Sequence, residues 1–122
     1  MNRTLLFVCP HGAAKSRMAA AFFNAAAPSG WHATTAGHEP AARVNPLTLQ
    51  LVKGTVAEPH LDLEPPRPLA AVTNPDRVVA IDCPVPGAEQ WNLDHQEMGE
   101  AMRDELERRV NALALEVEGV GH

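Results

Sequence analysis

The sequence contains no tyrosine, and aromatic residues make up only 4% of its 122 residues. This scarcity argues against a surface that binds sugars or bases by stacking. No apolar run approaches the ~20 residues needed to cross a bilayer. No secretory signal is visible either, because the apolar run at residues 5–8 is short and Cys9 interrupts it. We therefore expect a cytoplasmic protein without a membrane partner.

Cysteine is also scarce, since Cys9 and Cys83 are the only two in the sequence. Two cysteines do not make the disulfide framework of a secreted protein, so a catalytic or redox role is the better interpretation. The net charge of −5 argues against nucleic-acid binding. Charge is uneven along the chain, with +4 over residues 1–57 and −9 over residues 58–122. The basic half contains Cys9, which favours attraction of an anion there.

Hydrophobic residues make up 45% of the chain, enough for the core of one domain over residues 1–122. An apolar run at residues 3–8 is typical of a buried strand, and Asn45-Pro46 is a typical helix start. Five prolines make residues 57–75 irregular, with one short helical turn expected near Leu69. The pattern predicts strands at 3–8, 31–36, 77–81 and 89–93, and helices at 13–27, about 45–54 and about 95–117.

The last predicted helix carries an apolar stripe at three- and four-residue spacing. This stripe consists of Met98, Met102, Leu106, Val110, Leu113 and Val117. Strands that alternate with helices predict an α/β fold, a four-stranded parallel sheet flanked by helices in a doubly wound arrangement. Cys9 then lies at the carboxyl edge of the first strand, where such sheets bind ligands.

The segment after Cys9 has the pattern of an anion-binding loop. A short loop connects the first strand to an alanine-rich helix, and Lys15 and Ser16 stand where that helix begins. The start of a helix offers free backbone N–H groups and the positive end of its dipole. Such a place binds oxyanions and favours the thiolate form of a cysteine. We therefore interpret Cys9 as a thiolate nucleophile beside a phosphate-sized anion.

Residues 6–19, LFVCPHGAAKSRMA, resemble the start of the low-molecular-weight protein tyrosine phosphatase superfamily, and most closely its branch containing the arsenate reductases. Thr35-Ala36-Gly37 followed by Asn45-Pro46 is similar to the family's second strand and helix. The resemblance covers roughly residues 3–115. Its later active-site segment is matched by Cys83-Pro84, Trp91 and Asp94.

The resemblance implies a mechanism and a set of site residues. Cys9 attacks phosphate or arsenate, Ser16 hydrogen-bonds its sulfur, and Asp94 protonates the leaving oxygen. Backbone N–H groups of the loop hold the three non-bridging oxygens. The residues expected to bind the substrate are His11, Gly12, Ala13, Ala14, Lys15, Ser16 and Arg17.

Three positions depart from the family's pattern. Lys15 stands where the family has arginine, and a lysine offers one compact charge in place of a planar fork. Gly12 replaces an asparagine whose side chain braces the loop. Asp94 is followed by His95, whereas the family has Asp-Pro. Lys15 and Gly12 therefore keep open a third role, a module that binds an oxyanion without turnover.

Cys83 distinguishes two chemistries. An arsenate reductase needs a second thiol to release arsenite from Cys9, and this thiol is either Cys83 or an external small thiol. A phosphomonoester phosphatase needs none. We expect arsenate reduction, with thioredoxin or a low-molecular-weight thiol as the external reductant. Cys9, His11, Cys83 and His95 match no strong zinc spacing, so we expect no bound metal or cofactor.

Overall fold

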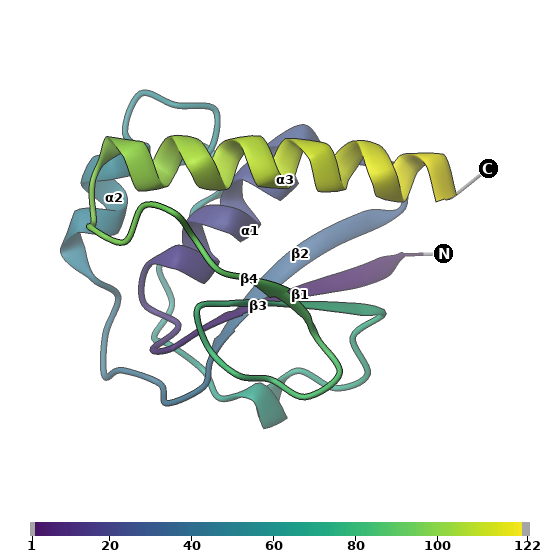
Figure 1. Cartoon of the computed structure of the whole chain (residues 1–122), viewed down its shortest axis with the longest axis horizontal. Helices are drawn as coiled ribbons and strands as arrows, with labels where there is room; N and C mark the ends of the chain where they lie inside the picture. The colour runs from purple at the N-terminus through teal and green to yellow at the C-terminus, as the bar shows by residue number, and fades with distance from the viewer. Residues whose placement is uncertain (1, 121–122) are drawn as a thin grey trace.

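A four-stranded parallel sheet forms the centre of the computed structural model, which describes residues 2–120 and, for residues 119 and 120, the backbone only. The strands are β1 (Arg3–Cys9), β2 (Trp31–Gly37), β3 (Arg77–Ile81) and β4 (Glu89–Trp91), in the order β2-β1-β3-β4. All neighbouring pairs are parallel. The carboxyl ends of the strands therefore share one edge of the sheet, away from the chain termini (Figure 1).

The central strand β1 has apolar side chains on both faces because the sheet is covered on both sides. Leu5 and Phe7 belong to the core under the helices, whereas Leu6 and Val8 belong to a second cluster on the opposite face. All four side chains are essentially inaccessible to solvent. The run is continuously apolar because β1 is a buried strand with both faces covered, as the sequence predicts.

All three α-helices pack on one face of the sheet, as Figure 1 shows. They are α1 (Lys15–Ala26), α2 (Pro46–Val52) and α3 (Glu100–Val120). Phe23 of α1 packs edge-on against Phe7 of β1, with 6.2 Å between the ring centroids. Asn45 caps α2 as expected, because its side chain accepts a hydrogen bond from the N–H of Leu47. The expected α/β class with a four-stranded parallel sheet is confirmed.

The opposite face of the sheet is covered by loops. The proline-rich segment contains two short 3-10 turns, η1 (Glu58–His60) and η2 (Leu69–Ala71), of which the sequence predicts the second. Leu69 packs on the apolar cluster of this face, together with Val85 from the loop after β3. The irregular connection expected over residues 57–75 is thus confirmed, and its prolines explain why no longer helix forms there.

The last helix begins later than the sequence predicts. The expected start near His95 is wrong, because α3 begins at Glu100. The backbone N–H groups of Asp94 and His95 donate to the carboxylate of Glu105, the sixth residue of α3. The helical stripe from Met102 onward is buried as predicted, whereas Met98 lies in the preceding loop and is half-buried. Similarly, β4 ends at Trp91, two residues early.

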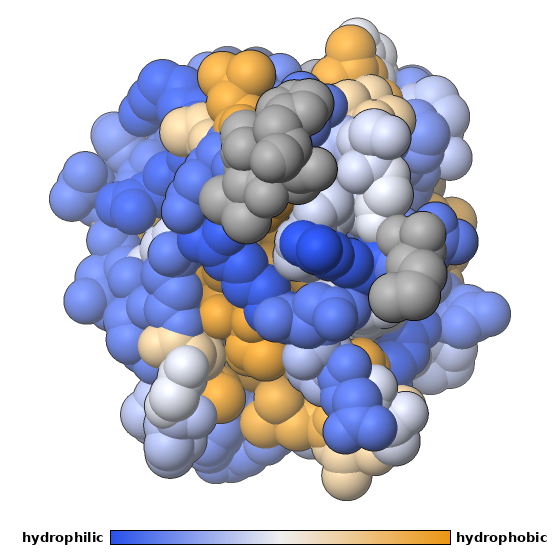
Figure 2. All heavy atoms as spheres, turned by 90° about the vertical axis from the view of Figure 1, so that its right-hand side faces the viewer, coloured by the Kyte–Doolittle hydropathy of each residue, from blue (hydrophilic) through white to orange (hydrophobic). Residues whose placement is uncertain are grey.

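The end of the molecule near the chain termini shows mostly hydrophilic atoms, with an apolar strip through its middle (Figure 2). It lies at the amino ends of the strands, opposite the edge that carries Cys9. Across residues 2–120, no helix combines the length and the apolar character that a bilayer crossing requires.

Candidate active site

Cys9 ends β1, and its buried sulfur contacts the start of α1. The Sγ atom lies 3.2 Å from the Ser16 hydroxyl oxygen, close enough for a hydrogen bond. Ser16 is fully buried and also hydrogen-bonds the hydroxyl of Thr35 on β2. A thiol donates to the Ser16 oxygen, whereas a thiolate accepts from the Ser16 hydroxyl, which can rotate. The sequence indicates Ser16 for this role, but nothing local in it indicates Thr35.

The loop that follows Cys9 is held by its carbonyl groups. Each carbonyl from Cys9 to Ala14 accepts a hydrogen bond from outside the loop or from α1. Most of these donors belong to the segment after β2, which returns past the loop on its way to α2. In order, the donors are the N–H groups of His38, Glu39 and Ala41, the side chain of Arg17, the N–H of Asn45 with the hydroxyl of Thr48, and the N–H of Met18.

The N–H groups of the loop are left available by this arrangement. In the described part of the chain, no backbone N–H of residues 11–16 donates a hydrogen bond to another protein group. Carbonyls held outward turn the neighbouring N–H groups inward, because each peptide unit is planar. Unpaired N–H groups of this kind, at the start of a helix, suit a tetrahedral oxyanion. The imidazole of His11 is turned away, with Nδ1 3.1 Å from the Glu39 carbonyl oxygen.

Two glycines let the loop lie directly on the end of β2. Gly12 has a φ of +64°, and a Cβ there would come within 2.7 Å of the Gly37 nitrogen. A Cβ on Gly37 would lie 2.6 Å from the His11 carbonyl carbon. The backbones are therefore too close for any side chain at either position. This contact explains the departure at Gly12, since an asparagine there would collide with the backbone of β2.

Arg17, expected among the substrate-binding residues, lies on the carbonyl side of the loop. Its side chain is fully buried, and Nε donates to the Gly12 carbonyl at 2.6 Å. Nη1 donates to the Asp62 carbonyl, also at 2.6 Å. Burial lowers the pKa of the Arg17 guanidinium, and the nearby Asp62 carboxylate opposes that shift. Arg17 therefore contacts the loop from behind.

Lys15 forms an ion pair with Asp82, the residue that follows β3. The ammonium nitrogen lies 2.8 Å from Asp82 Oδ2 and 3.4 Å from the amide oxygen of Gln96. Asp82 also accepts hydrogen bonds from the Leu93 N–H and the Gln96 side chain. Lys15 thus connects the oxyanion loop to the segment that contains Asp94.

Cys83 lies on the other face of the sheet from Cys9. Its side chain belongs to the loop-covered cluster and Cys9 to the cluster under the helices, and both thiols are free. Cys83 Sγ lies 3.7 Å from the Val8 carbonyl oxygen. Burial raises the pKa of the Cys83 thiol, and the adjacent Cys9 and Asp82 raise it further. A raised pKa leaves less of the Cys83 thiol in the nucleophilic thiolate form, and a charge on Cys9 disfavours that form further.

Asp94, the expected acid, is exposed in the loop between β4 and α3. The buried Glu105 holds that loop, because its carboxylate accepts from the N–H groups of Asp94 and His95, the His95 Nδ1 and the Arg109 Nε. Burial alone would raise the pKa of Glu105, but these hydrogen bonds lower it to about 2. Sequence analysis did not identify Glu105 as a site residue, since it is one of many charged residues in the last helix and nothing in the sequence distinguishes it from the others.

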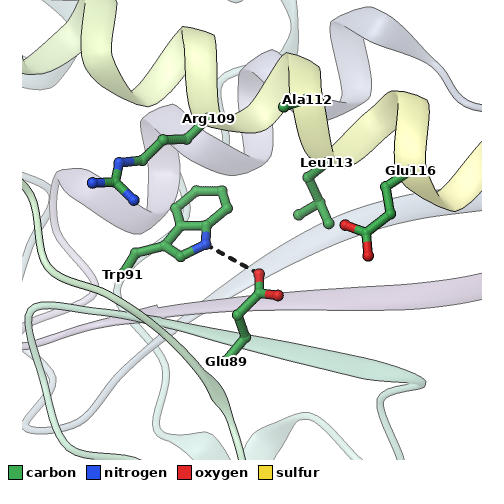
Figure 3. A pocket seen from close by; sticks show the side chains of 6 residues that line it. All are labelled: Glu89, Trp91, Arg109, Ala112, Leu113 and Glu116. Atoms are coloured by element: carbon green, nitrogen blue, oxygen red, sulfur yellow. Dashed lines mark hydrogen bonds between the residues drawn. The ribbon is translucent and has the colours of Figure 1, made fainter.

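A surface pocket lies apart from this site, between β4 and α3 (Figure 3). The carboxylates of Glu89 and Glu116 pair with Arg77, and Arg109 pairs with Glu105 outside the pocket. The Trp91 indole donates to Glu89 Oε2 at 3.0 Å. The lining residues are Glu89, Trp91, Arg109, Ala112, Leu113 and Glu116. Within residues 2–120, no three His, Cys, Asp or Glu side chains are grouped so that they could hold a metal ion.

The fold and the site have counterparts among solved structures. The arsenate reductase from Archaeoglobus fulgidus is 31% identical to this chain, with a TM-score of 0.69 over 90% of this chain and 98% of that one. A thioredoxin-dependent arsenate reductase from Corynebacterium glutamicum is 24% identical, with a TM-score of 0.74 over 99% of this chain and 64% of that one.

A phosphatase also shares the fold. The YwlE arginine phosphatase from Geobacillus stearothermophilus is 21% identical, with a TM-score of 0.70 over 98% of this chain and 97% of that one. Identities below 25% show a shared fold alone, whereas the archaeal enzyme is similar in sequence over nearly its whole length. No family model matches the chain, and neither does any curated protein sequence.

Proposed function

Because this chain belongs to the low-molecular-weight protein tyrosine phosphatase superfamily, on its arsenate reductase branch, we propose that it reduces arsenate with Cys9 as the nucleophile. The observation that carries the proposal is the loop after Cys9, whose carbonyls are held outward and whose N–H groups are unpaired. The presence of a second cysteine, Cys83, favours a reductase, because a phosphatase needs no second thiol.

In the first step, the N–H groups of residues 11–16 bind arsenate and the Cys9 thiolate attacks arsenic. A sulfur–arsenic bond forms and an arsenic–oxygen bond breaks, and the oxygen leaves as water after it takes up protons. Asp94 is the proposed donor of one of these protons. The Ser16 hydroxyl, 3.2 Å from Sγ, stabilises the thiolate before the attack.

In the second step, a second thiolate attacks the Cys9 sulfur. A disulfide forms, the sulfur–arsenic bond breaks, and its electron pair stays on arsenic, which leaves as arsenite. The attacking thiol is Cys83 or an external small thiol. The packing of Cys83 on the opposite face means that its own attack requires the loop after β3 to move. Thioredoxin or a small thiol then returns the protein to the reduced state.

The test measures arsenite release with thioredoxin and, separately, with glutathione or mycothiol. Wild type, Cys9→Ser and Cys83→Ser are compared. We expect turnover in wild type and none in Cys9→Ser. Loss of turnover in Cys83→Ser identifies Cys83 as the resolving thiol, and retained turnover with a small thiol identifies the external route. Oxyanion binding without turnover under any reductant would contradict the proposal.

Phosphomonoester hydrolysis is the second candidate. It is favoured by the fixed Asp94 segment, which Glu105 and Asp82 hold beside Lys15, and by the burial of Cys83 away from the Cys9 face. Cys9 then attacks phosphorus, Asp94 protonates the leaving alcohol, and water releases phosphate. This activity predicts hydrolysis of an aryl phosphate that survives Cys83→Ser and disappears in Cys9→Ser. Full activity in Cys9→Ser would eliminate it.

A further inference from the structure

The guanidinium of Arg17 is a buried charge that contacts the oxyanion loop from its carbonyl side. Its side chain has no accessible surface and makes two short hydrogen bonds to backbone carbonyls, of Gly12 and of Asp62. Its third nitrogen, Nη2, is buried and has no hydrogen-bond partner among residues 2–120. A buried guanidinium with an unpaired nitrogen costs free energy of folding, and an apolar side chain would avoid that cost. Packing therefore does not explain this arginine.

The Gly12 carbonyl depends on Arg17 alone. The other five carbonyls between Cys9 and Ala14 accept from backbone N–H groups, and Ala13 has the Thr48 hydroxyl in addition. In the described chain, the Gly12 oxygen accepts only from Arg17 Nε, at 2.6 Å. Gly12 itself has a φ of +64° and no side chain that could restrict its rotation. Without Arg17, no hydrogen bond within the described chain would hold the carbonyl of the peptide after Gly12.

That peptide carries the N–H of Ala13 at the middle of the loop. The Gly12 carbonyl and the Ala13 N–H belong to one planar unit and point in opposite directions. A carbonyl held against Arg17 on the outside therefore directs the Ala13 N–H toward the anion. Through its hydrogen bond to the Gly12 carbonyl, Arg17 thus orients the Ala13 N–H without contacting that group itself.

Arg17 is itself held by a second arginine through a shared carboxylate. Asp62 lies 3.7 Å from Arg17 Nη1 and 2.8 Å from Arg67 Nη2. Arg67 Nη1 also donates to the Thr35 carbonyl at 2.9 Å. Burial alone would raise the pKa of Asp62, but the hydrogen bond from Arg67 lowers it, so the carboxylate stays charged between the two guanidinium groups. The segment at residues 62–67 thus fixes Arg17 relative to β2.

We propose that Arg17 is a positioning residue for oxyanion binding, which orients the Gly12–Ala13 peptide in place of the asparagine side chain that this loop lacks. The inference rests on the proposed function only in requiring that the loop bind a phosphate-like anion. It does not depend on whether arsenate is reduced or a phosphate ester is hydrolysed.

The test compares the binding of inorganic phosphate to wild type, Arg17→Met and Arg17→Lys by calorimetry. A second readout is the rate at which iodoacetamide alkylates Cys9, with and without phosphate, measured on the Cys9 peptide by mass spectrometry. The matched control is Arg103→Met, because Arg103 also donates to a backbone carbonyl, of Leu51 at 3.1 Å, but lies outside the loop. Circular dichroism and thermal unfolding monitor the fold of each variant.

We expect Arg17→Met to bind phosphate about tenfold more weakly or worse, because one donor to a charged oxygen is misdirected. Arg17→Lys should recover part of the loss, since one ammonium can reach one carbonyl, and millimolar guanidinium should partly restore Arg17→Met. Arg103→Met should bind as wild type does.

Wild-type phosphate affinity and wild-type protection of Cys9 in a folded Arg17→Met or Arg17→Lys would overturn the inference. If Arg17→Met does not fold, the Arg17→Lys comparison decides. If wild type binds no phosphate, the inference fails, since it requires an anion in the loop. If wild type binds phosphate but releases no arsenite with any reductant, the proposed function fails and the comparison of Arg17 variants still decides the inference.

Discussion

The side chain of Glu105 holds the backbone of Asp94, because Glu105 Oε2 accepts a 3.0 Å hydrogen bond from the Asp94 N–H. Glu105 has an exposed fraction of only 3%. Its carboxylate also accepts hydrogen bonds from the His95 N–H, the His95 imidazole and the Arg109 guanidinium. The proposed acid is thus presented by a loop whose position depends on one buried charge. This relationship leads to the first of four predictions.

Glu105 should make stability depend on acidity. Its pKa in the folded protein, about 2, lies below its usual value of 4.5, so its stabilising effect is complete above pH 4.5 and is lost as the pH falls toward 2. The shift corresponds to a loss on the order of 3 kcal/mol in the free energy of unfolding. Glu105→Gln should be less stable at pH 7 and should lack this acid-dependent loss, as measured by urea unfolding between pH 2 and pH 7.

The matched control for that experiment is Glu116→Gln, since the Glu116 side chain is 55% exposed in its ion pair with Arg77. Exposed pairs contribute about 0–1 kcal/mol, so the control should follow wild type closely. Identical pH profiles for Glu105→Gln and wild type would show that Glu105 is not the group responsible.

Ser16 should control the reactivity of Cys9. The Ser16 hydroxyl contacts both Cys9 Sγ and the Thr35 hydroxyl, and all three side chains are buried. Ser16→Ala removes the hydrogen bond to the thiolate, so alkylation of Cys9 by iodoacetamide at pH 7 should slow by about tenfold. Thr35→Val, which leaves that hydroxyl in place but frees its orientation, should give a smaller effect in the same direction. Equal rates in wild type and Ser16→Ala would exclude this role.

Lys15 should limit anion affinity. Its single ammonium is already paired with Asp82 at 2.8 Å, so it has little capacity left for a bound oxyanion. An arginine can keep that pair and still offer a second nitrogen to the anion. Lys15→Arg should therefore bind phosphate about three- to tenfold more tightly by calorimetry, and Lys15→Met more weakly than wild type. Weaker binding by Lys15→Arg would mean that the compact ammonium suits this site better.

Gly37 should be intolerant of any side chain. A Cβ there would meet the His11 carbonyl carbon at 2.6 Å, and overpacking of this kind costs about 1–3 kcal/mol. Gly37→Ala should lower the midpoint of thermal unfolding and weaken phosphate binding, because the oxyanion loop must move. Gly87→Ala is the control: its φ of +82° is strained for alanine, but nothing lies within 4 Å of the added atom. A loss of stability in Gly87→Ala without a loss of phosphate affinity separates strain from displacement of the loop.

Local patterns predicted much of the architecture. The apolar run of β1, the Asn45-Pro46 start of α2 and the proline-rich segment each have a cause within a few residues, and each is found as expected. The predicted start of α3 at His95 was wrong, because residues 94 and 95 belong to a loop whose N–H groups donate to the carboxylate of Glu105, the sixth residue of the helix. Short-range patterns do not reveal such a contact.

The sequence alone determined the order of the elements and the composition of the oxyanion loop, since strand periodicity, helix caps and loop residues act between neighbours in the chain. Tertiary structure decided what surrounds that loop. Gly12 rests on Gly37, Lys15 pairs with Asp82, and these partners are 25 and 67 residues away along the chain. Parallel strands bring such residues to one edge through long crossovers, so their contacts depend on the packed sheet and leave no periodic trace in the sequence.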